Sequence, residues 1–306
     1  MKILCCGFFP ALQRTIEYSS FRTGEVNRAK KVSVTASGKV ANVARVVKQL
    51  GGDPLLLSFI GGATGETVKQ LLAKEQVDCR WIATAAATRI CQTLLSDDSD
   101  EMTELVENSD SLSAAEWKAL IKAFQSVENE FEQIIISGTL PPHAPETVYA
   151  ELLAHTAGRK VLIDSHGAPL LATLERRPAI VKINAEELCK TIQPPDGKIK
   201  TAAKELLARG AGAVGITQGG DCALLFTPDA EYIFEIPAID AVNPIGSGDS
   251  VSAGMAFALA KGSSLVEAFI FGLACGTSNA MNLEPGKINP EQIASLIPGI
   301  KTTDFH

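Results

Sequence analysis

The sequence of 306 residues lacks any arrangement of cysteine or histidine that would hold a metal ion or a disulfide frame. Its seven cysteines are odd in number, scattered along the chain, and form no C-x-x-C pair. Its four histidines show no ligand spacing. This pattern predicts reduced thiols in a cytoplasmic protein, and it argues against a zinc-binding or disulfide-rich class.

Basic residues are also in deficit, with 28 Lys and Arg against 35 Asp and Glu, so that the formal net charge is −7. Nucleic acid and anionic membranes require a basic surface, and we therefore expect neither as a partner. No apolar run approaches the roughly 18 to 20 residues that a membrane span needs. The N-terminal apolar run is short and broken by Gly7 and Pro10, which predicts a first β-strand and not a signal peptide.

Two common nucleotide-binding motifs are missing. No G-x-x-x-x-G-K-[ST] segment occurs, which excludes a P-loop. The G-x-G-x-x-G fingerprint is absent because Val251 occupies the place of its third glycine, and no Gly-rich turn follows the first predicted strand. A nicotinamide-dependent dehydrogenase is therefore disfavoured.

Apolar runs of strand length alternate with segments of helical pattern. The runs that we expect to be buried on both faces of a sheet are residues 134–136, 160–164, 179–182 and 213–217. The predicted helices include residues 113–131, 145–157 and 200–209, the last of them stopped by Gly210. This alternation predicts an α/β fold with a mostly parallel central sheet and helices on both of its faces.

Two stretches depart from this alternation. Residues 15–35 and 88–107 alternate polar and apolar side chains, and an acidic turn, S-D-D-S-D, divides the second stretch as in a hairpin. We expect these stretches to form a small β-sheet outside the main domain. The predicted division is a main α/β domain of residues 1–14, 36–87 and 109–306, with a β lid of residues 15–35 and 88–108.

A glycine-rich turn, N-P-I-G-S-G-D-S, occupies residues 243–250, between a strand-like segment at 235–241 and a helix of small residues. The first N–H groups of a helix have no internal partner, and glycine lets an anion approach them. Asp249 would lie in the first turn, where it could accept a proton from an alcohol while these N–H groups hold a phosphoryl group. The alternative is an ordinary helix start in which Asp249 is only a good capping residue.

Two further clusters are compatible with phosphate chemistry. Lys39 begins a predicted helix, where a bound anion would offset its unfavourable interaction with the helix dipole, and Arg89 could supply a bidentate second contact. The alternative for Lys39 is an exposed and screened lysine. Asn184 and Glu187 have the spacing of a capping box, and a carboxylate at this strand end could equally hold a Mg²⁺-bound water near phosphates.

Six segments carry a likeness to a known family. They are G-E-V-N-R-A-K-K-V-S-V-T-A-S-G-K-V-A-N-V-A-R-V, T-R-I-C, T-E-L-V-E, I-S-G-T-L-P, V-K-I-N-A-E-E-L and N-P-I-G-S-G-D-S-V-S-A-G. In this order the chain resembles the ribokinase-like sugar kinases, the phosphofructokinase B family, from end to end. It looks closest to the branch that contains 1-phosphofructokinase and tagatose-6-phosphate kinase. The resemblance implies a ribokinase-like fold, ATP and Mg²⁺ as cofactors, and leaves open a homodimer formed through the lid.

The resemblance also implies three groups of site residues. The catalytic group, a base and an anion hole for the phosphoryl group, consists of Asp249 with Gly246, Ser247 and Gly248. The substrate-binding group, which holds the sugar and its existing phosphate, consists of Gln13, Gly38, Lys39, Asn42, Arg89 and Asp249. The nucleotide group, in which Glu187 also holds Mg²⁺ through water, consists of Asn184, Glu187, Thr217, Gly219 and Asn279.

The chain departs from the family mainly at the sugar end. Where the family has N-P-x-x-D after the first strand, this chain has F-P-A-L-Q, which replaces an amide by Phe9 and a sugar-binding aspartate by Gln13. The other departures are Ser37 and Val40 in place of glycines, Ile183 in place of a proline, and Cys222 in place of a glycine.

The resulting expectation is an ATP- and Mg²⁺-dependent kinase that converts a ketohexose monophosphate, of the fructose 1-phosphate or tagatose 6-phosphate type, to a bisphosphate. Two alternatives stay open: a kinase of an unphosphorylated sugar or nucleoside, and a non-catalytic sugar-phosphate-binding relative. Arg89 beside Lys39 favours a phosphorylated acceptor, because two cations at a neutral sugar would have no partner. Asp249 favours catalysis, because a binding protein would not need it.

Overall fold

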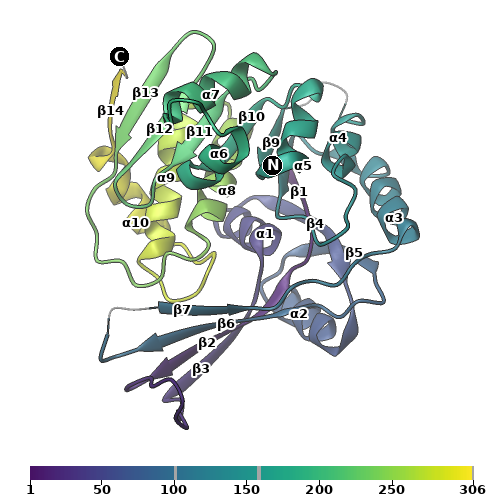
Figure 1. Cartoon of the computed structure of the whole chain (residues 1–306), viewed down its shortest axis with the longest axis vertical. Helices are drawn as coiled ribbons and strands as arrows, with labels where there is room; N and C mark the ends of the chain where they lie inside the picture. The colour runs from purple at the N-terminus through teal and green to yellow at the C-terminus, as the bar shows by residue number, and fades with distance from the viewer. Residues whose placement is uncertain (100–101, 157–159, 305–306) are drawn as a thin grey trace.

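The computed structural model of the chain describes residues 1–99, 102–156 and 160–304. Figure 1 shows a large body of sheet and helices above a small, separate sheet. Three parts of the predictions lie outside the described residues: Asp100 in the predicted acidic turn, Ala157 at the end of a predicted helix, and the last two residues of the main-domain range.

The large sheet has the strand order β14-β13-β12-β11-β10-β9-β8-β1-β4-β5 within the described residues. Its parallel strands are β1 (Lys2–Gly7), β4 (Asp53–Ile60), β5 (Asp78–Ala83), β8 (Gln133–Ser137), β9 (Val161–Asp164), β10 (Ile180–Asn184) and β11 (Val214–Thr217). The antiparallel strands at one edge are β12 (Cys222–Phe226), β13 (Glu231–Glu235) and β14 (Lys301–Asp304). The predicted mostly parallel sheet is confirmed.

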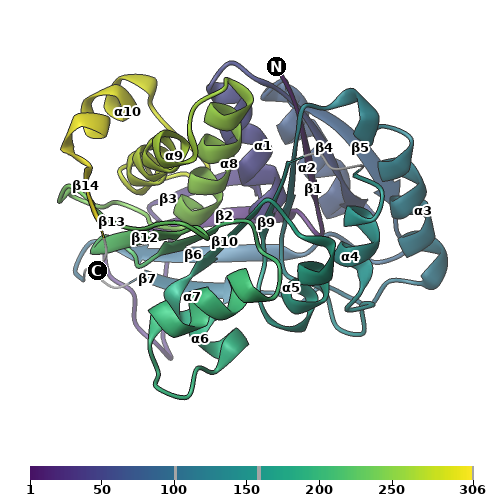
Figure 2. The ribbon, with the colours of Figure 1, turned by 90° about the horizontal axis from the view of Figure 1, so that it is seen from above.

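Helices cover both faces of this sheet, as Figure 2 shows. One layer consists of α1 (Lys39–Gln49), α2 (Gly62–Lys74), α8 (Ser247–Ala260), α9 (Leu265–Ala280) and α10 (Pro290–Leu296). The other consists of α3 (Ala114–Gln125), α4 (Val148–Leu153), α5 (Gly167–Thr173), α6 (Ala185–Ile192) and α7 (Ile199–Ala208). No helix of the described residues is long and apolar enough to cross a membrane.

Strand β1 shows why both faces are covered. Ile3 and Cys5 belong to the apolar cluster under the first helix layer, whereas Leu4 and Cys6 belong to the cluster under the second. All four side chains are fully buried. Because successive side chains of a strand point to opposite faces, an uninterrupted apolar strand requires helices on both sides.

The predicted helix ends are less accurate than the helices themselves. Helix α3 starts at a capping box of Ser113 and Glu116, as its pattern suggests, but ends at Gln125 instead of Phe131. The amide of Val127 turns to the Phe124 carbonyl oxygen, a 3₁₀-type bond that tightens the chain after the last helical turn. The 3₁₀ helices of the described residues are η1 (Glu128–Glu130), η2 (Leu174–Arg176) and η3 (Ile297–Gly299).

Helices α8 and α9 approach closely because α9 carries glycines at their crossing. A Cβ on Gly272 would lie 2.6 Å from the Val251 carbonyl oxygen. A Cβ on Gly276 would lie 3.0 Å from the carbonyl oxygen of Ser247, the first residue of α8. Side chains at these positions would push the two backbones apart.

The small sheet has the strand order β3-β2-β6-β7, with β3 at Lys31–Ser37, β2 at Ala11–Tyr18, β6 at Ile90–Ser96 and β7 at Met102–Val106. Strands β6 and β7 are an antiparallel pair, whereas β2 and β6 are parallel. The strands overlap the predicted lid ranges but extend to Ala11 and Ser37, where β2 and β3 pair with each other. The division into two domains stays a prediction.

The strand predicted at residues 235–241 is wrong. Strand β13 ends at Glu235, and an irregular segment, residues 236–246, leads to α8. Pro237 and Pro244 have no N–H group to donate to a sheet ladder, which explains why the apolar pattern here does not form a strand.

Candidate active site

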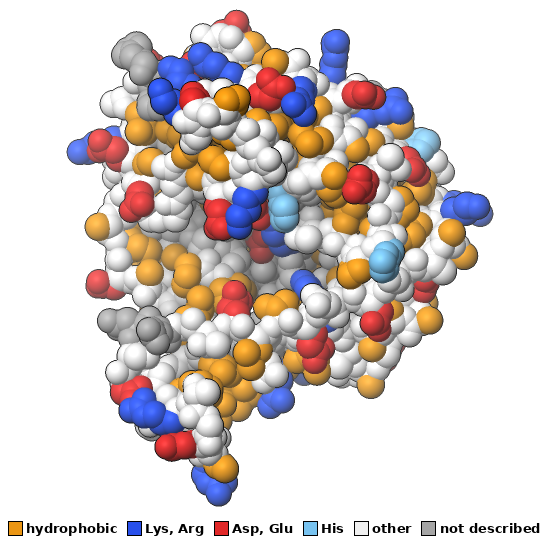
Figure 3. Space-filling view, in the orientation of Figure 1, with side chains coloured by type: hydrophobic (Ala, Val, Ile, Leu, Met, Phe, Trp, Pro, Cys, Tyr) orange, Lys and Arg blue, Asp and Glu red, His pale blue; other side chains and the backbone are white. Residues whose placement is uncertain are grey.

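A cavity of about 1010 Å³ lies between the carboxyl ends of the central strands and the small sheet. Figure 3 shows it as a hollow between the main body and the small sheet, with charged side chains at its rim. The predicted site residues that line it are Gln13, Gly38, Lys39, Asn42, Arg89, Asn184, Glu187, Thr217, Gly219, Gly246, Ser247, Gly248 and Asp249. The fold therefore brings together residues from all three predicted groups.

The glycine-rich turn forms the start of α8, as predicted. Gly246 is the N-cap residue, with a φ of +80°, a left-handed conformation that favours glycine. Ser247 and Gly248 are the first helical residues; the Ser247 N–H donates to the Pro244 carbonyl oxygen at 3.1 Å, whereas the Gly248 N–H has no partner within the helix. A Cβ on Gly248 would lie 2.6 Å from Lys182 Nζ. Gly248 thus leaves room for a buried ammonium group directly beside the helix start.

Asp249 lies in the first turn of α8 and is 7% exposed. Asn42 Nδ2 donates a hydrogen bond to its Oδ2 at 2.8 Å. Burial raises the pKa of Asp249 to about 6, an effect that the charge of Lys39 opposes and that of Asp164 assists. A carboxylate with such a pKa can take up a proton near neutral pH. This environment differs from that of an exposed capping residue.

Asp164 is a component of the site that the sequence motifs did not indicate. It ends β9, is fully buried, and accepts hydrogen bonds from Lys182 Nζ at 3.2 Å, Lys39 Nζ at 3.3 Å and Ser252 Oγ at 2.7 Å. Burial alone would raise its pKa, but the two ammonium groups lower it to about 2. The available signal was its place at the carboxyl end of an apolar parallel strand, where binding sites of α/β sheets occur.

Lys39 is the first residue of α1, after Gly38, whose φ is +93°. Its Nζ lies 3.3 Å from Asp164 and 3.9 Å from Glu187. The carboxylate of Asp164 and, more weakly, that of Glu187 raise the pKa of Lys39 despite its burial. Carboxylates of the protein itself therefore supply negative charge that the sequence argument assigned to a bound anion, and Lys39 is not an exposed, screened lysine.

Asn184 and Glu187 form a capping box at the start of α6, with Asn184 Oδ1 accepting from the Glu187 N–H at 2.8 Å. Glu187 also lines the cavity, and its Oε1 lies 3.3 Å from His166 Nδ1. Burial alone would raise the pKa of Glu187, but His166 and Lys39 lower it by more than burial raises it, so the net shift of the pKa is downward. The structural role is shown, and the ionised carboxylate stays available for the predicted metal role.

Arg89 lies just before β6 and lines the cavity from the small sheet. Its Nη1 makes one long contact, 3.5 Å, with the Glu107 carbonyl oxygen. Its Nε is buried and has no hydrogen-bond partner among the described residues. A buried guanidinium donor without a partner is costly. Arg89 therefore has free capacity for an anionic ligand.

Gln13, on β2, is 3% exposed and donates from Nε2 to Thr93 Oγ1 at 2.8 Å. Its amide oxygen is thus the group left to meet a ligand. Phe9, which stands where the family has an amide, is absent from the cavity lining and packs on Phe59 in the core, with ring centroids 5.9 Å apart. Its φ of +54° turns the side chain into the core, a conformation that the residue type did not suggest.

The resemblance assigns Asn279 to the nucleotide group, and this assignment stays a prediction. Asn279 is fully buried and does not line the cavity. Its Nδ2 donates to the Ile245 carbonyl oxygen at 2.8 Å and to Ser247 Oγ at 3.0 Å, and its Oδ1 accepts from the Gly286 N–H at 2.6 Å. Asn279 holds the segment that leads into α8.

The part of the cavity beside β11 combines a glycine turn with apolar side chains. Thr217 ends β11, and Gly219, with a φ of +65°, follows it in a turn with open space on its Cα. The apolar side chains that line this end are Ile236, Pro237, Ile239, Leu273 and Ala280. This end therefore combines exposed backbone with an apolar wall.

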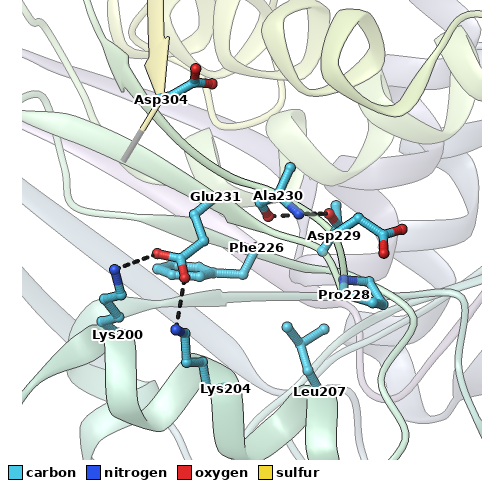
Figure 4. A pocket seen from close by; sticks show the side chains of 10 residues that line it. Lys200, Lys204, Leu207, Phe226, Pro228, Asp229, Ala230, Glu231 and Asp304 are labelled. Atoms are coloured by element: carbon cyan, nitrogen blue, oxygen red, sulfur yellow. Dashed lines mark hydrogen bonds and ion pairs between the residues drawn. The ribbon is translucent and has the colours of Figure 1, made fainter. Parts of the chain in front are cut away.

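A second hollow, of about 760 Å³, lies between α7 and the β12–β13 turn (Figure 4). Glu231 points to both lysines of α7, at 2.7 Å from Lys200 and 2.8 Å from Lys204. None of the predicted site residues lines this hollow. Glu231 already pairs with both lysines, and we assign the hollow no role in catalysis.

The fold and the cavity, with a buried carboxylate at an anion-binding helix start, define a sugar kinase, a phosphotransferase that acts on a sugar hydroxyl. The chain belongs to the pfkB family of carbohydrate kinases, whose family model matches residues 8–291. The resemblance read from the sequence is thereby confirmed.

Three relatives illustrate the similarity. The 1-phosphofructokinase of Bacillus subtilis (strain 168) is 30% identical over 299 residues, which cover 96% of this chain and 97% of that protein. The structure of phosphofructokinase-2 from Escherichia coli in complex with substrates and products has 26% identity and a TM-score of 0.86, with 98% of each chain covered. A Thermotoga maritima structure described as a possible 1-phosphofructokinase shares the fold, with 19% identity, a TM-score of 0.90 and full coverage of both chains.

We predict that Asp164→Asn destabilises the protein in a pH-dependent manner. The pKa of Asp164 is lowered from 3.8 to about 2, so its charge contributes stability above about pH 4, and this is lost as the pH falls through about 2. The contribution amounts to about 2 kcal/mol. Urea unfolding of both proteins should show a difference at neutral pH that shrinks in acid. A difference that does not change with pH would contradict this electrostatic account.

Proposed function

We propose that the chain transfers the terminal phosphoryl group of ATP, with Mg²⁺, to a hydroxyl of a ketohexose monophosphate of the fructose 1-phosphate or tagatose 6-phosphate type. The products are a bisphosphate and ADP. The observation that carries the proposal is Asp249, a buried carboxylate at the start of α8 that lines the same cavity as Arg89, whose buried Nε has no hydrogen-bond partner among the described residues.

The chemical step uses groups that already lie together. Asp249 accepts the proton of the attacking hydroxyl as the new oxygen–phosphorus bond forms and the bond to ADP breaks. The N–H groups at the start of α8 face the charge on the transferred group. Lys182 Nζ, beside Gly248, adds a positive charge at the same place.

The residues present fit a magnesium ion that is shared with the nucleotide. In the described residues no group of three or more His, Cys, Asp or Glu side chains could hold a metal ion by itself. Glu187 is an ionised cavity-lining carboxylate that would hold the ion through water, as Mg²⁺ sites at phosphates commonly do. Asp164 is already paired with two lysines. When bound, Mg²⁺ neutralises phosphate charge.

The two ends of the cavity suit two different substrates. The turn at Thr217 and Gly219, with its apolar wall, suits the phosphates and base of a nucleotide. The end with Gln13, Gly38, Asn42 and Arg89 suits a sugar phosphate, because Arg89 would otherwise keep a buried donor without a partner. A kinase of a neutral sugar would leave Arg89 without an anionic partner. A non-catalytic binding protein would have no use for Asp249.

The homodimer through the small sheet also stays a proposal. Val32, Val34 and Leu105, on the face of that sheet away from the cavity, are 41%, 42% and 48% exposed and would be covered in such a dimer. Light scattering tests this, and a monomer at all concentrations would contradict it.

The decisive experiment is a screen of ATP consumption with fructose 1-phosphate, fructose 6-phosphate, tagatose 6-phosphate and the unphosphorylated sugars. We expect turnover with at least one phosphorylated ketohexose. Turnover with unphosphorylated sugars alone would reject the proposed acceptor class, and none with any sugar would favour the non-catalytic alternative.

Asp249→Asn should lower kcat by about 10²- to 10⁴-fold, because an amide cannot accept the proton. Folding and nucleotide binding should persist. In the unmodified enzyme, kcat should fall as the pH drops below about 6, since only the ionised carboxylate of Asp249 acts as a base. Asp240→Asn, an exposed carboxylate outside the cavity lining, is the control. Near-normal turnover of Asp249→Asn would end the assignment.

Arg89→Ala should raise KM for the sugar phosphate by about 10- to 100-fold through the loss of charged hydrogen bonds. KM for ATP should stay almost unchanged. Arg176→Ala serves as the control, because Arg176 is exposed and does not line the cavity. If KM for ATP rose instead, Arg89 would bind the nucleotide and not the sugar phosphate.

Gln13 should limit the use of fructose 1-phosphate and tagatose 6-phosphate. An aspartate offers charged acceptors worth about 1.5–3 kcal/mol, against about 1 for the neutral amide oxygen, so binding should be about two- to thirtyfold weaker. Gln13→Asp should improve kcat/KM for at least one of the two sugars. Gln13→Glu adds the negative charge without shortening the side chain, so comparing it with Gln13→Asp distinguishes the effect of charge from the effect of side-chain length. Efficient use of either sugar by the unmodified enzyme, impaired by Gln13→Asp, would show that the amide is an equivalent ligand.

A further inference from the structure

Arg45, on α1, is a buried arginine that joins four parts of the chain, and it is 7% exposed. Its Nε and Nη2 bind the Glu75 carboxylate at 2.6 Å and 3.0 Å. Nη2 also donates to the Ala36 carbonyl oxygen, and Nη1 donates to that of Pro285 at 2.9 Å. A further contact reaches the site, from Nη1 to Asn42 Oδ1 at 3.2 Å.

The chemistry of these donors sets the orientation of the Asn42 amide. A guanidinium group can only donate hydrogen bonds, so the Asn42 atom that faces Arg45 must be the oxygen. Ser37 Oγ donates to the same oxygen at 3.2 Å. The amide nitrogen is therefore left to face Asp249, and it donates to Oδ2 at 2.8 Å.

This arrangement makes the two oxygens of Asp249 different. Oδ2 accepts from Asn42, whereas Oδ1 has no hydrogen-bond partner among the described residues. An acceptor hydroxyl in the cavity would compete with Asn42 at Oδ2 but would meet no competing donor at Oδ1. The base therefore has one oxygen that is held and one that is open.

We propose that Arg45 is a positioning residue for the phosphoryl transfer. By fixing the amide of Asn42, it holds Oδ2 of Asp249 and leaves Oδ1 to accept the proton of the sugar hydroxyl. The inference rests on the proposed function, since it takes Asp249 as the base. Without Arg45, the amide of Asn42 can rotate and turn its oxygen toward the carboxylate, where two acceptors repel each other.

The loss of this hydrogen bond has a predictable effect on Asp249. The charged groups that face Asp249 are Lys39 from α1, Asp164 from β9 and Lys182 from β10. Substitution of Arg45 leaves all three in place. The bond from Asn42 favours the ionised carboxylate, so its loss raises the pKa of Asp249.

The test uses two variants with different risks to folding. Arg45→Lys keeps a cation for Glu75 but loses the several N–H donors of the guanidinium group. Arg45→Met combined with Glu75→Met removes both charges. In both variants we expect the acid limb of kcat to move up by about 0.5 to 1 pH unit. Near pH 6, the pKa of Asp249, kcat should fall about two- to sixfold, while at alkaline pH it should stay within about threefold.

A second readout does not depend on activity. Titration of the Asp249 carboxylate by carbon-13 NMR, in the protein without nucleotide, should show the same upward shift in both variants. Arg209→Met, which removes the exposed ion pair with Glu205 at 2.7 Å, should shift neither measurement. This control matches the loss of an arginine–glutamate pair outside the cavity.

The outcomes separate the inference from the proposed function. If both Arg45 variants melt at a lower temperature but titrate like the unmodified protein, Arg45 only supports the fold and the inference is overturned. If the NMR shift appears while Asp249→Asn stays active, Arg45 does hold the carboxylate, but Asp249 is not the base and the proposed function fails.

Discussion

The buried carboxylate of Asp164, between the ammonium groups of Lys39 and Lys182, is the interaction on which the site depends. The carboxylate of Asp164, at the end of strand β9, holds the ammonium groups of two lysines that line the cavity. The pair of lysines leaves a surplus positive charge, which partly offsets the burial of Asp249. Without Asp164, Lys182 would be a buried cation with no ion-pair partner among the described residues, at a cost of several kcal/mol.

The cavity contains cations of two kinds. Lys39 and Lys182 are paired with carboxylates of the protein, which hold them without any ligand. Arg89 has a buried donor with no partner in the described residues. The paired cations shape the potential at the reacting centre, whereas Arg89 gains most from a ligand. This distinction agrees with membership of a family of sugar kinases.

The architecture was readable from the sequence because strands buried on both faces are uninterrupted apolar runs between helical patterns. The glycine-rich start of α8 was readable because its motif is local. Asp164 and Lys182 were not, because each is a single polar residue at a strand end whose partners lie far along the chain. The place of Phe9 in the core could not be predicted, because the residue type does not reveal a left-handed backbone conformation. The irregular segment at residues 236–246 has the composition of a strand apart from its prolines.

The close crossing of α8 and α9 determines where the first turns of α8, which carry Asp249, lie in the fold. Gly272 and Gly276 leave the α9 backbone in direct contact with the first turns of α8. The position of Asp249 in the cavity therefore depends on two residues of the neighbouring helix that lack a Cβ atom. One added carbon atom at either glycine would displace the first turns of α8, and the carboxylate of Asp249 with them, without altering any charged group.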